Sequence, residues 1–219
     1  MVLLSKLRLK HKAQDVYVLG SGPSLGYVND RFLNDKIIIC VNNTIDFVTE
    51  AQHMYLVAKE PTRKMQEQIR QKNGLLVTCE RRFGGRGADN EILYPDQTVL
   101  FQPREGAIKD VDQLTCLERS ASTMSTAIHL AAFLGAKTIL LIGHDCGKLD
   151  EKVHADDYDK SEAVTPESYY SKWMGQFCVE QQTLVLKQIL KIKYDIEMYS
   201  VNPFINFGLE GHSYQSFSS

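Results

Sequence analysis

Polar residues follow directly on three apolar, strand-like segments of this 219-residue chain. The groups are Gly20-Ser21-Gly22-Pro23-Ser24 after Val16–Leu19, Asn42-Asn43-Thr44 after Ile37–Val41, and Gly143-His144-Asp145 after Thr138–Ile142. In open α/β sheets, ligands bind beyond the carboxyl ends of the strands. We therefore expect these groups to meet at one edge of a sheet. Their convergence is stronger evidence for a binding site than any single motif.

The turn from Gly20 to Ser24 has the residue types of a phosphate-binding loop. Gly20 and Gly22 allow a sharp turn and a close approach to a ligand. Pro23 is favoured at the first position of a helix, and the N–H groups at a helix start attract anions. The turn is not the dinucleotide fingerprint, because no third glycine stands at the required offset. It predicts a nucleotide-phosphate site, with a purely structural loop as the alternative.

Three further groups of residues are candidates for nucleotide contact. Asn42 and Asn43 can hydrogen-bond a base or a ribose, although asparagine after a strand is also a common turn former. Glu60 follows another predicted strand. Three roles are open to it: accepting hydrogen bonds from ribose hydroxyls, holding a metal ion, or stabilising a helix N-terminus through its negative charge. Ser122 and Thr123 open a predicted helix, where hydroxyl groups cap the helix and also bind phosphate.

The candidate catalytic residues are His144, Asp145 and His154. His144 can accept a proton near neutral pH, and the alternative is a structural histidine. Asp145 either binds Mg²⁺ through its carboxylate or caps the next turn. His154 and Tyr158 lie in residues 147–167, a polar, acidic stretch that is long for a loop in a compact domain. We expect a lid that closes over the substrate, with a solvated acidic loop as the alternative.

Strand-like and helical segments alternate along the chain, and near-continuous apolar runs indicate strands buried on both faces. The predicted strands are Val16–Leu19, Ile37–Val41, Met54–Val57, Leu75–Thr78, Thr98–Gln102, Thr138–Ile142 and Ile196–Val201. The predicted helices are Pro61–Lys72, Ser122–Leu134 with Gly135 as its cap, and a long helix from about Ser168 to Lys193. This alternation predicts a single α/β domain over residues 1–219, Rossmann-like, with a mostly parallel sheet, helices on both faces and the lid.

Composition limits the function classes. The net charge of −2 argues against a general nucleic-acid-binding surface, which carries a basic excess. The five cysteines are widely spaced without a C-x-x-C pair, so we predict no zinc or redox motif and a reducing, cytoplasmic setting. No apolar run approaches the roughly 20 residues of a membrane-spanning helix.

Residues 1–12 carry an unusual local charge. Lys6, Arg8, Lys10 and Lys12 alternate with leucines. Two interpretations follow: a short helix that makes peripheral membrane contact, or a solvated leader helix that covers a sheet edge. The sequence also leaves homo-oligomerisation open.

The order and spacing of several blocks between residues 15 and 207 resemble two related families. The blocks are Leu19-Gly-Ser-Gly-Pro-Ser-Leu25, Cys40-Val-Asn42, the helix Ser122–Gly135, Ile139-Leu-Leu-Ile-Gly-His-Asp145, and Asn202-Pro203 with Asn206-Phe207. One family is the bacterial lipooligosaccharide sialyltransferases, glycosyltransferase family 42. The other is the 6-hydroxymethylpterin diphosphokinase-like proteins, whose domain also occurs in flagellin-modifying motility factors.

The resemblance to the sialyltransferases implies roles for particular residues. Binding of a CMP-sugar donor carries over to Gly22, Pro23, Ser24, Asn42, Ser122 and Thr123. Three departures stand out. The chain has Glu60-Pro61 where the family has Asn-Pro, it lacks the general-base histidine near Met174–Phe177, and the family's lid tyrosines have only loose counterparts. Those counterparts are Tyr158, Tyr169 and Tyr170.

The resemblance implies a glycosyltransferase-like enzyme that uses a nucleotide-activated sugar. The expected donor is a CMP-nonulosonate of the sialic-acid type, the acceptor is a glycan or another hydroxyl compound, and no cofactor is required. His154 or His144 would replace the missing base. Two alternatives stay open: an Mg²⁺-dependent diphosphokinase that uses ATP or GTP, with Asp145 and Glu60 near the metal, and a catalytically degraded nucleotide-binding module.

Overall fold

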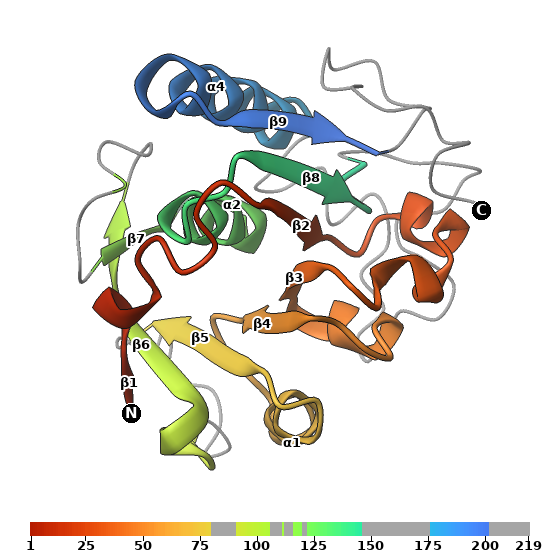
Figure 1. The fold of residues 1–219 in the computed structure, drawn as a ribbon, viewed down its shortest axis with the longest axis vertical. Coiled ribbons are helices and arrows are strands. Elements are labelled where there is room, and N and C mark those ends of the chain that lie inside the picture. The colour runs from red at the N-terminus through yellow and green to blue at the C-terminus, as the bar shows by residue number, and fades with distance from the viewer. Residues whose placement is uncertain (80–90, 106–110, 112–115, 120–121, 146–175, 202–219) are drawn as a thin grey trace.

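The structure is a computed structural model that describes residues 1–79, 91–105, 111, 116–119, 122–145 and 176–201. In these residues nine strands form a sheet in the order β1-β6-β5-β4-β3-β2-β8-β9, with β7 paired to β6 (Figure 1). Every pairing in this part of the chain is parallel. The strands are β1 (Val2–Leu3), β2 (Asp15–Leu19), β3 (Ile37–Val41), β4 (His53–Val57), β5 (Leu75–Cys79), β6 (Thr98–Glu105), β7 (Cys116–Arg119), β8 (Thr138–Ile142) and β9 (Glu197–Ser200).

The chain changes direction across the sheet at β2. From β2 it steps outward through β3, β4, β5 and β6, and it later returns to place β8 and β9 on the other side of β2. This reversal creates a topological switch point between β2 and β8, where open α/β sheets bind their ligands. The predicted Rossmann-like, mostly parallel α/β sheet is confirmed.

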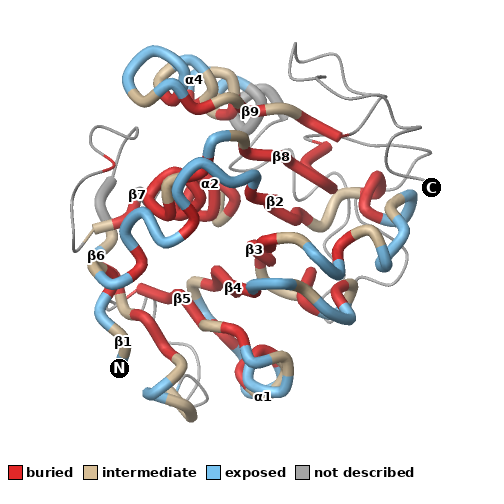
Figure 2. Tube along the Cα trace, viewed as in Figure 1, coloured by how far each residue is buried: buried red, intermediate tan, exposed pale blue. Residues whose placement is uncertain are grey.

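The strands separate two cores because successive side chains point to opposite faces. In β3, Ile37, Ile39 and Val41 join the core that contains α2 (Thr123–Phe133) and α4 (Gln176–Tyr194). Ile38 and Cys40 join the second core, which contains α1 (Arg63–Gln71). All five residues of β3 are buried, as Figure 2 shows for the centre of the sheet. Helices therefore cover both faces, as predicted.

Local sequence explains the bounds of two helices. The Thr62 hydroxyl caps α1 by accepting from the Met65 N–H at 3.2 Å. At the end of α2, Gly135 has φ +88°, and the Gly135 and Ala136 N–H groups donate to the carbonyls of Ala132 and Ala131. This is a Schellman cap, which favours glycine because of its positive φ. The predicted cap at Gly135 is confirmed.

Five short 3-10 helices complete the described elements. They are η1 (Leu4–Leu7), η2 (Pro23–Tyr27), η3 (Asp30–Leu33), η4 (Asn42–Phe47) and η5 (Pro95–Gln97). η4 begins directly after β3, and η2 begins at Pro23 after the short turn that follows β2, so both lie among the polar residues predicted to bind a ligand. Pro23 is the first residue of η2, as its fixed φ favours.

Residues 1–12 differ from both sequence interpretations, since they form neither a membrane-surface helix nor a leader helix. Val2 and Leu3 instead form the edge strand β1, paired with Val99 and Leu100 of β6. Leu4 and Leu7 of η1 then enter the core beside α2. Leu3 thus lies in the strand, Leu4 and Leu7 lie in the core and Leu9 stays exposed, so these residues do not form the amphipathic helix that their spacing suggested.

Strand β7 was not predicted, and β6 is three residues longer than predicted. Residues 102–105 of β6 pair with β7, beyond the stretch 98–101 that pairs with β5. Pro103 falls in this second part, opposite Leu117 of β7. Proline has no N–H to donate to a neighbouring strand, and sheets tolerate it at edge positions such as this one. The predicted lid at 147–167 and the first part of the predicted long helix lie outside the described residues. Within the described ranges, no helix combines the length and the apolar character needed to span a membrane.

Candidate functional site at the carboxyl edge of the sheet

The turns after β2 and β8 are bonded to each other at the switch point. The Gly20 N–H donates to the Ile142 carbonyl and the Gly22 N–H to the Gly143 carbonyl, each at 2.7 Å. A Cβ on Gly20 would lie 2.5 Å from the Gly143 carbonyl oxygen, so a side chain has no room there. Gly143 itself has φ +65°, which favours glycine. These glycines are required mainly because the two turns approach each other closely.

Asp145 binds the start of η2. Its Oδ2 accepts from the Ser24 N–H at 2.7 Å, and its Oδ1 accepts from the Ser24 hydroxyl at 2.5 Å. Both side chains are buried. The described contacts bind Asp145 to the earlier turn at Ser24, a role that neither alternative named; Mg²⁺ binding and capping of the next turn stay predictions.

The turn from Gly20 to Ser24 therefore differs from the phosphate-binding loop that its sequence indicates. The N–H groups of Gly20, Gly22 and Ser24 all donate within the protein, and the Leu25 N–H donates to the Gly22 carbonyl at 3.0 Å. The anion at the start of η2 is the Asp145 carboxylate. The physical reason is the close pairing of β2 with β8, which brings acceptors of the second turn against donors of the first.

Asn42 lies at the end of β3 with a left-handed backbone, φ +53°, a conformation that asparagine tolerates better than most residues. The Thr44 side chain fixes this turn, since its Oγ1 accepts from the Val41 N–H at 2.8 Å and donates to the Leu19 carbonyl at 3.1 Å. Thr44 is fully buried, whereas Asn42 and Asn43 are half-buried. The two asparagines are thus held at the edge with part of their surface open to solvent.

The N-terminus of α2 lies against the turn after β2. The Ser122 hydroxyl accepts from the Met124 N–H at 3.1 Å and caps the helix. A Cβ on Gly20 would lie 2.7 Å from Met124 Cε, so the first turn of α2 packs on Gly20. Ser122 and Thr123 are half-buried. The positive end of the helix macrodipole consequently lies at this edge, where it favours an anion.

His144 connects the end of β8 to α4. Its Nε2 lies 2.7 Å from the Thr183 hydroxyl, and both side chains are buried. Burial lowers the pKa of His144 from 6.5 to about 4, because the charged imidazolium loses its hydration. The ring is therefore neutral at pH 7, and it is part of the packing between strand and helix.

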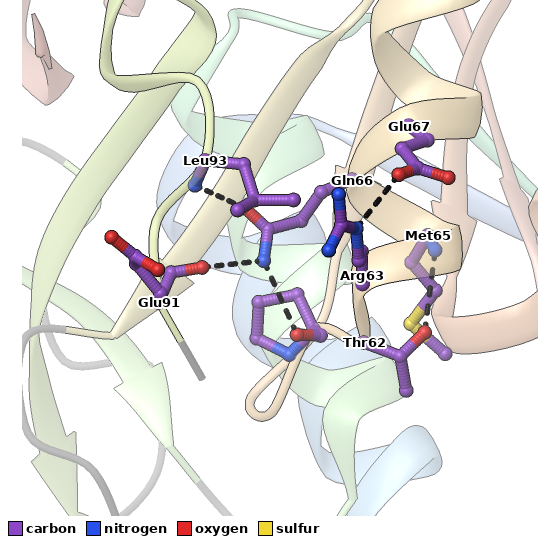
Figure 3. A network of polar contacts seen from close by, with 8 residues as sticks. Thr62, Arg63, Met65, Gln66, Glu67, Glu91 and Leu93 are labelled. Atoms are coloured by element: carbon purple, nitrogen blue, oxygen red, sulfur yellow. Dashed lines mark hydrogen bonds and ion pairs between the residues drawn. The ribbon is translucent and has the colours of Figure 1, made fainter. Parts of the chain in front are cut away.

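Glu60 is exposed after β4, and the segment that follows it is held by Gln66 (Figure 3). The Gln66 amide donates to the Glu91 carbonyl at 2.8 Å, and its Oε1 accepts from the Leu93 N–H at 2.9 Å. The same amide lies 3.5 Å from the Pro61 carbonyl. This buried side chain thereby ties the start of α1 to residues 91–93.

The predicted site residues fall into two groups by exposure. The buried group forms a frame of internal contacts and comprises Gly20, Pro23, Ser24, Gly143, His144 and Asp145. The outer group, half-buried or exposed, comprises Ser21, Gly22, Asn42, Asn43, Glu60, Ser122 and Thr123. His154 and Tyr158 lie outside the described residues, as do Tyr169 and Tyr170. Among the residues described, no group of three or more His, Cys, Asp or Glu side chains is placed to hold a metal ion.

Sequence reasoning placed Thr44 at this edge without assigning its role, although a threonine three residues after a strand end often bonds back to the backbone. It gave no role at this edge to three further residues: Gln66, Met124 and Thr183. Thr183 carried no signal, since its partner His144 is distant in sequence. Gln66 and Met124 read as ordinary helix residues, and only the tertiary contacts reveal their roles.

Comparisons with known proteins show the fold. No protein-family model matches the chain, and no curated protein matches its sequence. A variant of the sialyltransferase CST-II in complex with CMP is similar with a TM-score of 0.54 at 14% identity, over 90% of this chain and 86% of that one. CstII from Campylobacter jejuni, in complex with cytidine-5'-monophosphate, gives a TM-score of 0.53 at 15% identity, over 91% and 85%. The structure of CST-II with a trisaccharide acceptor and CMP gives 0.50 at 15% identity, over 90% and 85%. At these identities the likeness establishes that the chain shares the α/β fold of these sialyltransferases.

Proposed function

We propose that this chain is a glycosyltransferase that uses a nucleotide-activated sugar, with a CMP-nonulosonate as the favoured donor and a glycan-type hydroxyl as the acceptor. The observation that carries the proposal is the outer group of residues at the carboxyl edge of the sheet, which begins at the switch point and continues past β3 and β4. Support comes from the fold, which is shared over most of the chain with sialyltransferases solved in complex with CMP.

The geometry suggests how the donor is held. Because the N–H groups of Gly20, Gly22 and Ser24 donate within the protein, we place the donor phosphate at the N-terminus of α2, beside Ser122 and Thr123. Asn42 and Asn43 are then placed to hydrogen-bond the ribose or the base. Gly22 is half-buried, and the Asp145 carboxylate and the Gly143 carbonyl occupy the place of its missing side chain, so Gly22 shapes the turn behind the site.

The proposed reaction is a direct displacement. The acceptor oxygen attacks the anomeric carbon, the bond from that carbon to the phosphate oxygen breaks, and CMP leaves with the bonding electron pair. A base takes the proton of the acceptor hydroxyl. His144 is poorly suited to that role, because a pKa of about 4 gives it little affinity for a proton at pH 7. We assign His144 to positioning α4 and leave the role of base to His154.

A thermal-shift panel of CMP, CDP, UDP, ATP and GTP, each with and without Mg²⁺, tests the proposal. Ligand at about one hundred times Kd stabilises a protein by about 2.7 kcal/mol. For a chain of this size that raises Tm by roughly 5–10 °C. We expect CMP to stabilise the protein without metal. Stabilisation by a purine triphosphate with Mg²⁺ alone would instead support the diphosphokinase, and binding without donor hydrolysis or transfer would support the binding module.

A matched pair of variants locates the site. Asn42 and Asn73 share φ +53°, and glycine is tolerated at both. Asn73 lies at the end of α1, at the opposite edge of the sheet. Losing one ligand hydrogen bond, worth about 0.5–1.5 kcal/mol, should weaken CMP binding by about two- to tenfold in Asn42→Gly. Asn73→Gly should bind normally. Equal affinities in both variants would remove Asn42 from the binding site.

A further inference from the structure

Residues 1–12 concentrate positive charge in a chain that is acidic overall. They hold Lys6, Arg8, Lys10 and Lys12 without an acidic residue, whereas the whole chain has a net charge of −2. Such asymmetry is typical of a segment that meets an anionic partner. Nothing in the proposed transferase site uses it, since that site lies at the carboxyl ends of the strands.

The backbone of this segment is fixed to the body of the protein. Leu4 and Leu7 are buried in the core beside α2. The N–H groups of Leu9, His11 and Ala13 donate to the carbonyls of Phe133, Leu134 and Gly135 at 3.0, 2.8 and 2.9 Å. These carbonyls lie at the end of α2, where a helix lacks internal donors. The charged side chains are consequently displayed from a rigid support.

The side chains that point outward are of two kinds. Lys6, Arg8, Lys10 and Lys12 are exposed, and within the described part of the chain no acidic group pairs with Lys6, Lys10 or Lys12. Leu3 and Leu9 are also exposed, at 64% and 43%. Figure 2 shows the exposed stretches of the chain between β1 and β2. The segment thus exposes basic and apolar side chains together, with Leu9 between Arg8 and Lys10 in the sequence.

We propose that residues 1–12 are a docking surface for an anionic lipid membrane. Basic residues near such a surface attract the anionic headgroups, and apolar side chains enter the boundary between headgroups and acyl chains. A nucleic acid would use the lysines but would leave Leu3 and Leu9 without a role. Residues 9–13 lie at the amino ends of β2 and β8, the edge of the sheet opposite the proposed donor site.

Vesicle flotation of the full chain tests this surface. The vesicles contain phosphatidylcholine alone or mixed with phosphatidylglycerol. We expect binding to the anionic vesicles only, and the binding should weaken with added salt. Lys6→Gln/Lys12→Gln should lower the partition coefficient about 25-fold, at about fivefold for each charge removed. Leu3→Ser/Leu9→Ser should also lower it, which binding by charge alone would not.

The matched control is Arg63→Gln/Lys64→Gln on α1. It removes the same charge from exposed positions on the other face of the sheet, so it should bind vesicles like the unaltered protein. Circular dichroism confirms that each variant is folded. The proposal is overturned if the unaltered chain ignores anionic vesicles, if the control loses as much binding as Lys6→Gln/Lys12→Gln, or if a short DNA duplex binds where vesicles do not.

Discussion

Replacing Asp145 with asparagine tests whether its carboxylate holds the turn after β2 in place. The two oxygens accept from the Ser24 N–H at 2.7 Å and from the Ser24 hydroxyl at 2.5 Å, in a buried setting. Hydrogen bonds to a charged group contribute about 1.5–3 kcal/mol each, and neutral ones about 0.5–1.5 kcal/mol. Asparagine keeps the shape, and its one amide oxygen can still accept from the Ser24 N–H. Its NH2 group must then donate to the Ser24 hydroxyl oxygen, and both bonds become neutral. We therefore expect Asp145→Asn to lower the free energy of unfolding by about 2–3 kcal/mol.

Urea denaturation followed by circular dichroism measures this change. Ser24→Ala completes a double-mutant cycle, and the direct contact predicts a coupling of about 1 kcal/mol or more between the two positions. The control is Asp35→Asn, which alters an exposed carboxylate paired with Lys36 and should leave stability unchanged. Additive effects in the cycle would refute the claim that Asp145 holds the turn at Ser24. An Asp145→Asn variant as stable as the Asp35→Asn control would refute it too.

The same variant separates two accounts of nucleotide binding. If a phosphate competed with the Asp145 carboxylate for the Ser24 N–H, removing the negative charge would tighten CMP binding. If the carboxylate holds the frame behind the site, the loosened turn should weaken CMP binding. We expect weaker CMP binding. Titration calorimetry without urea, at the pH where the protein is most stable, measures it. Tighter CMP binding would indicate that the phosphate binds at the turn from Gly20 to Ser24.

Two further predictions concern stability. The pKa of His11, whose Nε2 lies 2.8 Å from the Tyr55 hydroxyl, is lowered from 6.5 to about 4 by burial and by the nearby His53, and that of His144 is lowered to about 4 by burial. Because both values are depressed on folding, stability is full above pH 6.5 and falls as the pH drops toward 4, by up to about 3 kcal/mol for each histidine. Urea midpoints at pH 7 and pH 5 check this, and equal free energies would contradict it. Gly135→Ala should cost about 1–2 kcal/mol, because φ is +88° and a Cβ would lie 3.1 Å from Lys12 Cα. An unchanged Tm would show that the α2 cap tolerates a side chain.

Much of the fold could be predicted because its central strands are buried on both faces. Ile37–Val41 and Thr138–Ile142 have the predicted bounds, since apolar runs of five and four residues between turn signals are typical of buried strands. β7 could not be predicted in this way. Two of its four residues are charged, and its pairing with β6 depends on backbone contacts that no local pattern encodes. The prediction of a helix in residues 1–12 failed for a related reason. The spacing of the leucines is compatible with a helix and also with a strand followed by a buried turn.

The edge that carries the candidate site could be predicted. Which of its residues make internal contacts and which remain open to a ligand could not. Ser24 and Asn42 both follow apolar strands, and their residue types suit ligand binding equally well. Only the structure shows that Ser24 is committed to Asp145, whereas Asn42 remains half-buried at the surface. A Ser24 variant that lost CMP binding would therefore report a damaged frame as readily as a lost contact. Asn42 and the first turn of α2 are the positions where a change in affinity can be attributed to the nucleotide itself.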